Sequence, residues 1–368
     1  PTSETIINHM FSKWIKSHRD LPILINQWAN VVRWEMRTRL FLRTSEFLWQ
    51  EGHTAHQTKE EATQEALQML DIYEEFTQQV AAVKVIKGTK SEIEKFAGAK
   101  VTYSIEAMML DKKALQAGTS HELGQNFSKA FEIQYSDEQN QLAHPYQTSW
   151  GVSTRLIGMI IMAHGDDKGL KLPPAIAPIQ VVIIPIIPKN TDPDEILRAA
   201  DKIKNSLPDI RVKIDDREEV SPGFKFNEWE LKGVPLRIEI GPKDIEQKSV
   251  IVARRDIVDS KTKILIETLP SEITKTLDLI QNDMFKVTED FLSANTSHAN
   301  DMDELLSQLK DNDGFVSCYW FEDKEDELKV KELTKATIRC YPLENTEEKL
   351  SVNKTDLHGK YAIFSKSY

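Results

Sequence analysis

The segment from Arg33 to His56 combines residue types that could bind phosphates and an amine. It contains four arginines, three glutamates, two tryptophans and two histidines. Guanidinium groups bind phosphates and carboxylates, and carboxylates accept hydrogen bonds from an ammonium group. A surface hairpin stabilised by cross-strand ion pairs is the alternative, but it does not need tryptophans and histidines among its charges. The composition therefore favours a ligand-binding site.

The same segment alternates between apolar and polar side chains, as two paired strands do. Successive side chains of a strand point to opposite faces, so one face should be apolar and the other charged. The expected apolar positions are Trp34, Met36, Leu40, Leu42 and Phe47, and those on or near the charged face are Arg33, Glu35, Arg43 and Glu51. The sequence therefore predicts an antiparallel ribbon that presents cations and carboxylates together.

Length and composition limit the class of protein. A chain of 368 residues is expected to form two or three domains. The net charge of -11 argues against a nonspecific nucleic-acid-binding surface but is compatible with a localised RNA site. The two cysteines, Cys318 and Cys340, predict a reducing compartment, most simply the cytoplasm. No apolar run approaches the roughly 20 residues that span a bilayer, so no membrane partner is expected.

The first domain is predicted over residues 1–172. After the charged ribbon comes an amphipathic helix from Lys59 to about Val83, and a strand is expected around residues 103–109. The domain closes with residues 149–163, which run into an apolar helix. A turn-rich segment at 165–174, with paired aspartates, glycines and prolines, marks the boundary.

Strands alternate with helices in the second predicted domain, residues 173–293, which indicates an α/β fold with a mixed or parallel sheet. The expected elements are strands at 181–187, 211–214, 236–240 and 250–253, helices at 192–206 and 271–293, and a glycine-rich connector before the third strand. A smaller, charged third domain is predicted over residues 294–368.

Several strings occur in an order typical of one family. They are PTSE at 1–4, VVRWE at 31–35, LRTSEFLWQEGHTAH at 42–56, EKFAG at 94–98, GTSHELGQNFSKAFEI at 118–133, SWGVSTR at 149–155, HGDDKGLKLPP at 164–174 and PGFKFNEWELKGVPLRIEIGPKD at 222–244. The ribbon resembles motif 2 of a class II aminoacyl-tRNA synthetase, and SWGVSTR with the string that follows it resembles motif 3. Over essentially the whole chain, the set resembles prolyl-tRNA synthetase of the archaeal/eukaryotic type.

The resemblance implies an α+β catalytic domain on an antiparallel sheet, an α/β anticodon-binding domain and a small α/β C-terminal domain. The implied reaction activates L-proline with ATP and Mg²⁺ to prolyl-adenylate and transfers proline to the 3'-terminal adenosine of tRNA(Pro). In the first step the carboxylate attacks the α-phosphorus and pyrophosphate leaves. Such catalysis depends on orientation and on neutralising negative charge, which suits arginines and magnesium.

By resemblance, two arginines are the catalytic residues. Arg33 would hold the proline carboxylate and the α-phosphate, and Arg155 would hold the far end of the triphosphate. The other residues implied at the nucleotide are Glu35, Arg43, Phe47, which would stack on adenine, Gln116 and Thr119.

Proline differs from other amino acids in its secondary ammonium and short apolar ring, so its site needs two hydrogen-bond acceptors and an aromatic wall. The resemblance places Thr2 and Glu4 at the amine. The ring-binding wall and its supports would be Trp49, Glu51, His53, Phe96, His121, Trp150 and Gly151.

The second domain carries the implied anticodon site. The resemblance assigns Phe226, Glu230, Arg237 and Lys243 to reading guanines, and the chemistry agrees because Arg and Lys donate to guanine O6 and N7 while an aromatic ring stacks on an unpaired base. Without the resemblance, Glu228, Glu230 and Lys232 would be interpreted as a solvated strand face.

Several departures from the family pattern bear on metals and partners. Many relatives carry a C-terminal zinc site with four cysteines, but here Trp320 is followed by Phe321 and Asp326 stands at the position of a thiolate. We expect no zinc, and we expect Cys340 to be a core thiol. The terminal Tyr368 fits relatives in which this residue folds back toward the catalytic domain.

No inserted editing domain fits between Arg33 and Arg155. Motif 1, which builds the dimer interface in class II enzymes, would precede Pro1, so we expect a longer homodimeric natural protein. A threonyl-type synthetase is disfavoured because its metal site needs cysteine and no cysteine precedes Cys318. The remaining alternative is a non-catalytic paralogue that binds tRNA or acts as a scaffold, which would be indicated by loss of the ATP-binding arginines.

Overall fold

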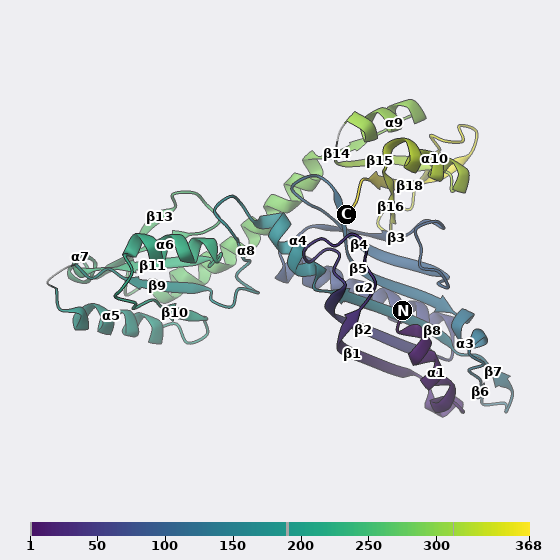
Figure 1. Cartoon of the computed structure of the whole chain (residues 1–368), viewed down its shortest axis with the longest axis horizontal. Coiled ribbons are helices and arrows are strands. Elements are labelled where there is room, and N and C mark those ends of the chain that lie inside the picture. Colours follow the sequence, from purple (N-terminus) through teal and green to yellow (C-terminus); the bar gives the residue numbers. More distant parts are fainter. Residues whose placement is uncertain (1, 189–190, 312) are drawn as a thin grey trace. The chain divides into compact units, whose positions relative to one another are not determined.

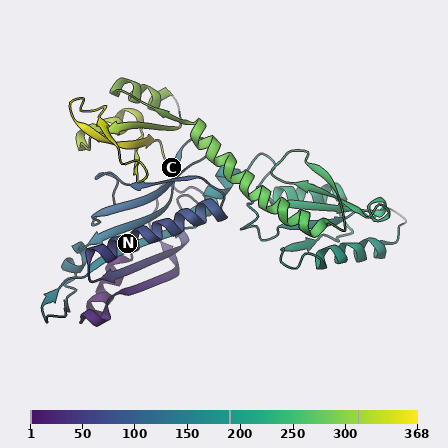
Figure 2. The same ribbon diagram turned by 180° about the vertical axis from the view of Figure 1, so that it is seen from behind.

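The computed structural model describes residues 2–188, 191–311 and 313–368, so Pro1 of the PTSE string lies outside the described residues. The chain forms two compact units. The first contains residues 1–77, 84–159 and 290–368, and the second contains residues 78–83 and 160–289. Figures 1 and 2 show the chain from two opposite sides.

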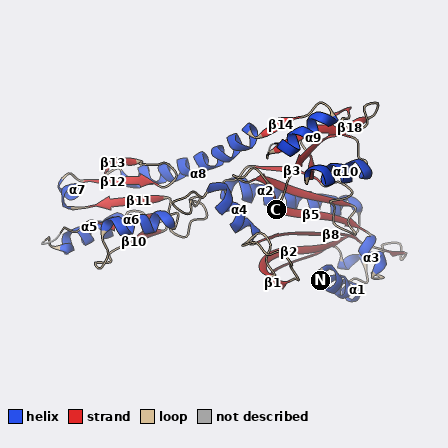
Figure 3. Cartoon of the chain, turned by 45° about the horizontal axis from the view of Figure 1, so that its top comes forward, coloured by secondary structure: helices blue, strands red, loops and turns tan. Residues whose placement is uncertain are grey.

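The helices are α1 (Glu4–Trp14), η1 (His18–Asp20), α2 (Lys59–Glu75), η2 (Phe76–Val80), α3 (Asn126–Ala130), α4 (Arg155–His164), α5 (Pro193–Asn205), α6 (Pro222–Leu231), α7 (Pro242–Glu246), α8 (Leu269–Ala294), α9 (Met302–Asp311) and α10 (Lys324–Thr334). The strands are β1 (Ile23–Val32), β2 (Glu46–His56), β3 (Val85–Thr89), β4 (Val101–Met108), β5 (Ala114–Gly124), β6 (Tyr135–Ser136), β7 (Leu142–Ala143), β8 (Tyr146–Ser153), β9 (Val181–Pro185), β10 (Val212–Ile214), β11 (Leu236–Ile240), β12 (Ser249–Arg254), β13 (Lys261–Leu265), β14 (Thr296–His298), β15 (Phe315–Trp320), β16 (Thr337–Pro342), β17 (Glu348–Leu350) and β18 (His358–Ser365). Figure 3 distinguishes the two kinds of element by colour.

One large sheet organises the first unit. Its strands follow the order β1-β2-β8-β5-β4-β3-β16-β18-β15-β14, with β17 paired to β18. Neighbouring strands are antiparallel except β14 and β15. The strands after residue 294 continue the sheet because β16 pairs with β3, Tyr341 opposite Thr89. The antiparallel sheet predicted for the first part of the chain is confirmed, and it extends into the C-terminal part.

Helix α2 covers one face of this sheet (Figure 2). Thr58 caps its first turn in a reciprocal capping box with Glu61. Buried Ala66, Leu70 and Tyr73 recur at helical spacing and form its sheet-facing side. The predicted start at Lys59 is confirmed, whereas the helix ends at Glu75, before the predicted end, because the chain widens into the π-turn η2.

The predicted ribbon is displaced along the chain. Strand β1 pairs with β2 in a register that puts Val31 opposite Phe47, and residues 33–45 form the loop between them. The prediction of two paired strands over residues 33–56 is wrong for the first part, where Trp34 is 91% exposed and Met36 is 82% exposed in a loop. The predicted separation of Phe47 from Glu51 is also wrong, because both lie on the same face of β2. Alternation in the loop resembled a strand, but the hydrogen-bonded partner of β2 is the β-branched and apolar stretch that precedes it.

The second unit holds a five-stranded sheet in the order β10-β9-β11-β12-β13. Strand β9 is parallel to β10 and β11, whereas β12 is antiparallel to both β11 and β13. The predicted mixed sheet is therefore confirmed. Helices α5 and α8 bury apolar side chains on one face of this sheet, and Trp229 of α6 packs with Val182 and Ile184 on the other.

Helix α6 lies where the sequence predicted a connector. Ser221 caps its first turn and Pro222 occupies the first helical position, which favours a helix start. Glu228 and Lys232 form an i,i+4 ion pair there with an N to O distance of 2.7 Å. The interpretation of Glu228, Glu230 and Lys232 as a strand face is therefore wrong. The glycines in this stretch are typical of a loop, but Ser221 and Pro222 specify a helix start.

Both cysteines are free and fully buried in strands of the C-terminal part. Burial raises the pKa of the Cys340 thiol to about 12, so it is protonated at neutral pH, and the prediction of a core thiol is confirmed. Within the described residues, no group of three or more His, Cys, Asp or Glu side chains is arranged to hold a metal ion. None of the described helices is both long and apolar enough to cross a membrane.

A buried carboxyl group joins helix α10 to the turn after β3. Glu327 is 3% exposed and accepts a hydrogen bond of 2.7 Å from Ser91 Oγ. Burial, with the negative charges of Glu94 and Glu322 nearby, raises the pKa of Glu327 from 4.5 to about 7. The folded state therefore retains this proton at pH values where the unfolded chain has released it.

This raised pKa predicts that stability falls as pH rises. Between pH 4.5 and pH 7 the folded state binds more protons at Glu327 than the unfolded state, so its contribution to the free energy of unfolding decreases across this interval. Glu327→Gln should lessen the decrease in thermal midpoint from pH 5 to pH 8, measured by scanning calorimetry beside the unmodified protein. An unchanged pH dependence in the variant would contradict this assignment.

Candidate active site

A cavity of about 400 Å³ lies in the first unit, where β2, β8 and β5 run side by side. Its lining residues are Thr2, Glu4, Arg33, Phe47, Trp49, Glu51, Phe96, Gln116, Ala117, Gly118, Thr119, His121, Ser149, Trp150, Gly151, Val152, Ser153 and Arg155. The cavity brings together most of the residues that the sequence assigned to ATP and proline, although they come from segments more than a hundred residues apart.

The strand register explains this convergence. Phe47, Trp49, Glu51 and His53 are alternate residues of β2, so their side chains share one face of the sheet. Glu51 lies opposite Gly151 in β8, and Gly151 lies opposite Thr119 in β5. Since directly paired residues point to the same face, three strands contribute side chains to one floor.

Trp150 lies on the opposite face. It is paired with Gly52 on one side and Ser120 on the other, and Ser120 Oγ donates to the carbonyl of Ala66 in α2. A Cβ atom on Gly52 would overlap the Trp150 ring. The indole therefore packs against Gly52 on the face of the sheet that α2 covers. Trp150 borders the cavity because β8 does, and its ring does not point toward a ligand.

Arg33 follows the last residue of β1 and is held between aromatic rings. Its Cζ atom lies 5.5 Å from the ring centre of Phe47 and 4.9 Å from that of Trp49. These rings meet edge to face at 5.8 Å. Arg33 Nε is buried without a hydrogen-bond partner, and no described carboxylate pairs with this guanidinium. The group is oriented by cation–π contacts and available to an anion.

Arg155 begins α4 and occupies another part of the lining. Its Nε donates to the Leu42 carbonyl at 3.2 Å and its Nη1 to the Gln116 carbonyl at 3.4 Å. Burial, with Arg43 nearby, lowers the pKa of the Arg155 guanidinium, although a group of this kind stays charged. Among the described residues it has no ion-pair partner, so like Arg33 it is a cation available to a ligand.

Carboxylates mark a different part of the cavity. Glu4 is buried and accepts hydrogen bonds from Thr2 and, at 3.2 Å, from Ser149 Oγ. Burial alone would raise the pKa of Glu51, but hydrogen bonds from His53, Ser3 and Gln27 outweigh it and lower the pKa. Glu51 is therefore ionised at neutral pH.

An aromatic wall completes this part. The Phe96 and His121 rings lie 4.8 Å apart, and Phe96 also stacks on Phe127. Burial lowers the pKa of His121 to about 4, and its Nδ1 lies 3.0 Å from Thr102 Oγ1. At neutral pH His121 is an uncharged ring beside a phenyl group, which suits an apolar part of a ligand.

Three residues predicted at the site are outside this lining. His53 is buried next to Glu51, with Nε2 3.3 Å from the carboxylate, and so supports it. Glu35 accepts a hydrogen bond from the Arg37 amide within the exposed loop. Arg43 donates to the main-chain oxygen of Tyr368 at 3.0 Å.

The position of Tyr368 confirms the expectation that this residue folds back. Its hydroxyl donates to the Asp111 carboxylate, and Arg39 lies 5.8 Å from its ring centre. The end of the chain thus contacts two arginines of the loop between β1 and β2.

Sequence reasoning missed part of the lining. Ser149 and Ser153 face the cavity because they alternate with Gly151 along β8, and the SWGVSTR string already contained that signal. Ala117 and Gly118 border it at an irregularity in the β4–β5 pairing, which no local pattern announces.

A second cavity, of about 250 Å³, lies in the second unit. Arg237 Cζ is 4.3 Å from the Phe226 ring centre, and both residues line it together with Glu230. Arg237 also pairs with Glu239 at 3.0 Å. Lys243 lies outside this lining, on exposed α7 beyond the other end of β11. Basic residues that the sequence interpretation did not single out also line it: Lys168, Arg254, Arg255 and Lys261.

Comparison with known families identifies three parts of the chain. The chain matches "tRNA synthetase class II core domain (G, H, P, S and T)" over residues 1–164, "Anticodon binding domain" over 180–276 and "Prolyl-tRNA synthetase, C-terminal" over 302–368. The fold and site therefore define a class II aminoacyl-tRNA synthetase.

Similar proteins identify the family within this class. The chloroplastic/mitochondrial proline–tRNA ligase of Arabidopsis thaliana is 52% identical over 376 residues, covering 100% of this chain and 69% of the relative. That of Natranaerobius thermophilus is 54% identical over 345 residues, covering 94% and 71%. The crystal structure of Cryptosporidium parvum prolyl-tRNA synthetase with L-proline and AMP has a TM-score of 0.95 at 43% identity, covering 100% of this chain and 78% of that one. The chain belongs to the prolyl-tRNA synthetases, the family of proline–tRNA ligases.

The packing of Trp150 on Gly52 gives a test of the site's floor. Gly52→Ala should destabilise the protein by about 1–3 kcal/mol, because the new methyl group displaces a buried indole. Gly223→Ala is the matched control, since no atom of the described residues outside its immediate chain neighbours lies within 4 Å of a Cβ at that position. Equal denaturant midpoints for the two variants would show that the β2–β8 pair is less tightly packed than described.

Proposed function

We propose that this chain activates L-proline with ATP and transfers the prolyl group to the terminal adenosine of tRNA(Pro). The observation that carries the proposal is the division of one cavity into two chemistries. Among the described residues, Arg33 and Arg155 are cations without carboxylate partners, whereas Glu4 and the ionised Glu51 offer carboxylate oxygens beside the aromatic wall. This arrangement fits a nucleoside triphosphate bound next to a small amino acid.

At the nucleotide, Arg33 would hold the α-phosphate and the proline carboxylate, and Arg155 the far phosphates. The carboxylate oxygen attacks the α-phosphorus, the bond to pyrophosphate breaks, and two fixed guanidinium groups stabilise the added charge. Phe47 would stack on adenine, and Gln116 and Thr119 would lie near the ribose and phosphates. We propose that Glu35 and Arg43 contact the nucleotide when ATP binding moves the loop at residues 33–45 toward the cavity.

Magnesium would enter with the triphosphate. Because the described residues offer no cluster of three ligating side chains, we propose that phosphate oxygens and water supply most of its ligands, as Mg²⁺ commonly prefers. The bound ion would neutralise phosphate charge. We propose no zinc, since Cys318 and Cys340 are both buried core thiols.

On the proline side, the secondary ammonium would donate to Glu4 and to Thr2. The ring would lie against Phe96, His121 and Trp49, with Glu51 and His53 holding the wall in place. Gly151 allows β8 to lie close to β2 at this point, because a Cβ there would lie 2.9 Å from the Gln50 carbonyl oxygen. Trp150 is assigned to support from the far face.

The tRNA is proposed to bind at both units. The ribose hydroxyl of its terminal adenosine attacks the carbonyl carbon of prolyl-adenylate, and AMP leaves. Arg237 lies against Phe226 and is paired with Glu239, and it would donate to a guanine while Glu230 would accept from a base edge. Lys243 remains a proposed contact from α7.

For type and assembly, we propose an archaeal/eukaryotic-type enzyme that acts as a homodimer in the cytoplasm. The type is supported by the absence of an inserted domain between Arg33 and Arg155.

A dimer is supported by exposed apolar residues along the edge strand β1, where Trp28 is 82% exposed. The cytoplasm is supported by the free thiols; since the Arabidopsis relative is chloroplastic/mitochondrial, imaging of the tagged natural protein is the test.

The alternative is a paralogue that binds tRNA or acts as a scaffold without catalysis. Such a protein would be expected to lose the ATP-binding arginines, but Arg33, Arg43 and Arg155 are all present. The assay that separates the two functions is proline-dependent ATP–pyrophosphate exchange. No exchange with proline would reject the catalytic proposal.

Arg33→Ala should lower the rate of proline-dependent exchange by about a thousandfold or more, since it removes a cation from the reacting phosphate. Arg37→Ala, an exposed arginine of the same loop, is the control and should retain exchange.

Arg237→Ala should leave exchange unchanged and lower tRNA(Pro) charging about tenfold or more, because a guanine contact is lost while the activation site is intact. Charging is measured with labelled proline under subsaturating tRNA. Loss of exchange in this variant would contradict the division of labour between the two units.

A further inference from the structure

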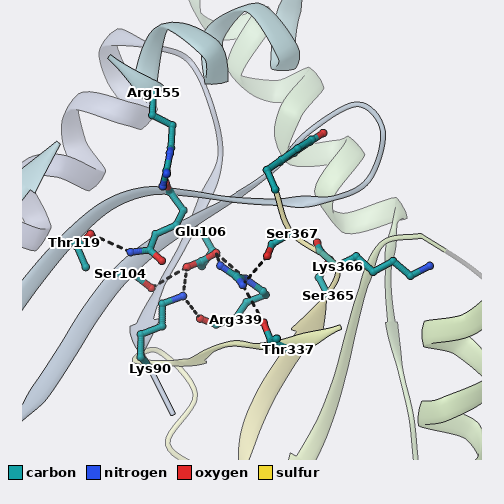
Figure 4. Close-up of polar contacts among 12 residues, drawn as sticks. Lys90, Ser104, Glu106, Thr119, Arg155, Thr337, Arg339, Ser365, Lys366 and Ser367 are labelled. Atoms are coloured by element: carbon teal, nitrogen blue, oxygen red, sulfur yellow. Dashed lines mark hydrogen bonds and ion pairs between the residues drawn. The ribbon is translucent and has the colours of Figure 1, made fainter. Parts of the chain in front are cut away.

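A buried charge triad joins the C-terminal strands to the catalytic part of the sheet. Glu106 is on β4, Lys90 follows β3, and Arg339 is on β16 (Figure 4). The Glu106 side chain is 0% exposed, and those of its partners are 2% and 6% exposed. None of the three was assigned a role from the sequence.

The carboxylate of Glu106 is fully occupied. Lys90 Nζ donates to Oε1, which also accepts from Ser104 Oγ at 3.0 Å. Arg339 donates to Oε2 through Nε at 3.1 Å and Nη2 at 3.0 Å. A buried charge without a partner is very costly, so this geometry is maintained only while all three groups are present.

On one side the triad reaches the nucleotide part of the cavity. Glu106 is paired across β4 and β5 with Gln116, and the register shifts beside it so that Ala117 has no partner in β4. The Gln116 carbonyl accepts the hydrogen bond from Arg155, and the Gln116 side chain donates to Thr119 Oγ1 at 3.0 Å. A bulge of this kind re-aims the backbone groups around it.

On the other side the triad reaches the C-terminal segment. Arg339 Nη1 donates to Thr337 Oγ1 at 3.0 Å and to Ser367 Oγ at 3.1 Å. Lys90 Nζ also donates to the Arg339 carbonyl at 2.7 Å. The carbonyl of Lys366 accepts from the Ala114 amide at the start of β5. The C-terminal part thus contacts β5 at Ala114 and the neighbouring strand β4 at Glu106.

We propose that Glu106, fixed by Lys90 and Arg339, is a positioning residue for the nucleotide: it sets the β4–β5 bulge from which the Gln116 carbonyl orients Arg155. This inference rests on the proposed function. The C-terminal strands would then contribute to ATP binding, although they are far along the sequence from Gln116 and Arg155. The charge balance is consistent, because Glu106 is an anion within a region that otherwise holds Lys90, Arg155 and Arg339.

The test compares Glu106→Gln with Glu327→Gln. Both carboxylates are buried and both connect the C-terminal part to residues next to β3, but Glu327 is bonded to Ser91 rather than paired with the β5 bulge. A junction that only stabilises the fold would give the two variants the same phenotype. Proline-dependent exchange is titrated separately with ATP and with proline, and thermal midpoints are recorded.

Glu106→Gln should raise the KM for ATP about tenfold or more and change the KM for proline by less than about threefold. Glu327→Gln should leave the KM for ATP within about twofold of the unmodified protein. Arg339→Met should reproduce the ATP defect, and Arg339→Lys, which keeps a cation but loses the fork, should restore part of it.

Two results would overturn the proposal: a folded Glu106→Gln protein with an unchanged KM for ATP, or the same ATP defect in Glu327→Gln. If Glu106→Gln does not fold, Arg339→Met and Arg339→Lys decide by the same criteria. Absence of exchange in the unmodified protein would reject the proposed function itself, whereas normal exchange in protein and variants alike would reject only the role of the triad.

Discussion

The pairing of β8 between β2 and β5 is the constraint on which the site depends. This register gives the central sheet two unlike faces, one covered by α2 and one that holds the cavity. A shift of one residue would exchange the faces and turn Glu51 and His121 toward the helix. The contact between Gly52 and Trp150 opposes such a shift, since the indole fits only where the neighbouring strand has no side chain. Packing on the face covered by α2 therefore keeps the cavity residues in position on the opposite face.

The electrostatics of the cavity follow a simple division. Its carboxylates have partners, Glu4 with Thr2 and Ser149, and Glu51 with Gln27 and His53, so their positions are fixed before a ligand arrives. Its arginines instead rest on aromatic rings and carbonyl groups, which orient a guanidinium without cancelling its charge. Pre-orientation of this kind reduces the reorganisation that binding a polyanion would otherwise require.

Local pattern predicted what local interactions determine. The start of α2, the mixed sheet of the second unit and the grouping of most site residues were accessible from the sequence, because periodicity, capping residues and ordered strings encode them. The loop at 33–45 was interpreted as a strand because alternation alone does not specify a partner. The pairing of β3 with β16 and the rear position of Trp150 depend on residues far apart in the chain, and no window of sequence contains them.

The junction of β3 and β16 also has a consequence for fragments of this protein. A strand at the end of a sheet exposes unpaired amide and carbonyl groups, which invite pairing with other chains. In the intact chain the C-terminal strands occupy the open side of β3. A fragment without them would expose that edge together with the Lys90–Glu106 pair, which would lose Arg339, and would be prone to aggregate. The C-terminal part is therefore a protective border of the catalytic sheet as well as an extension of it.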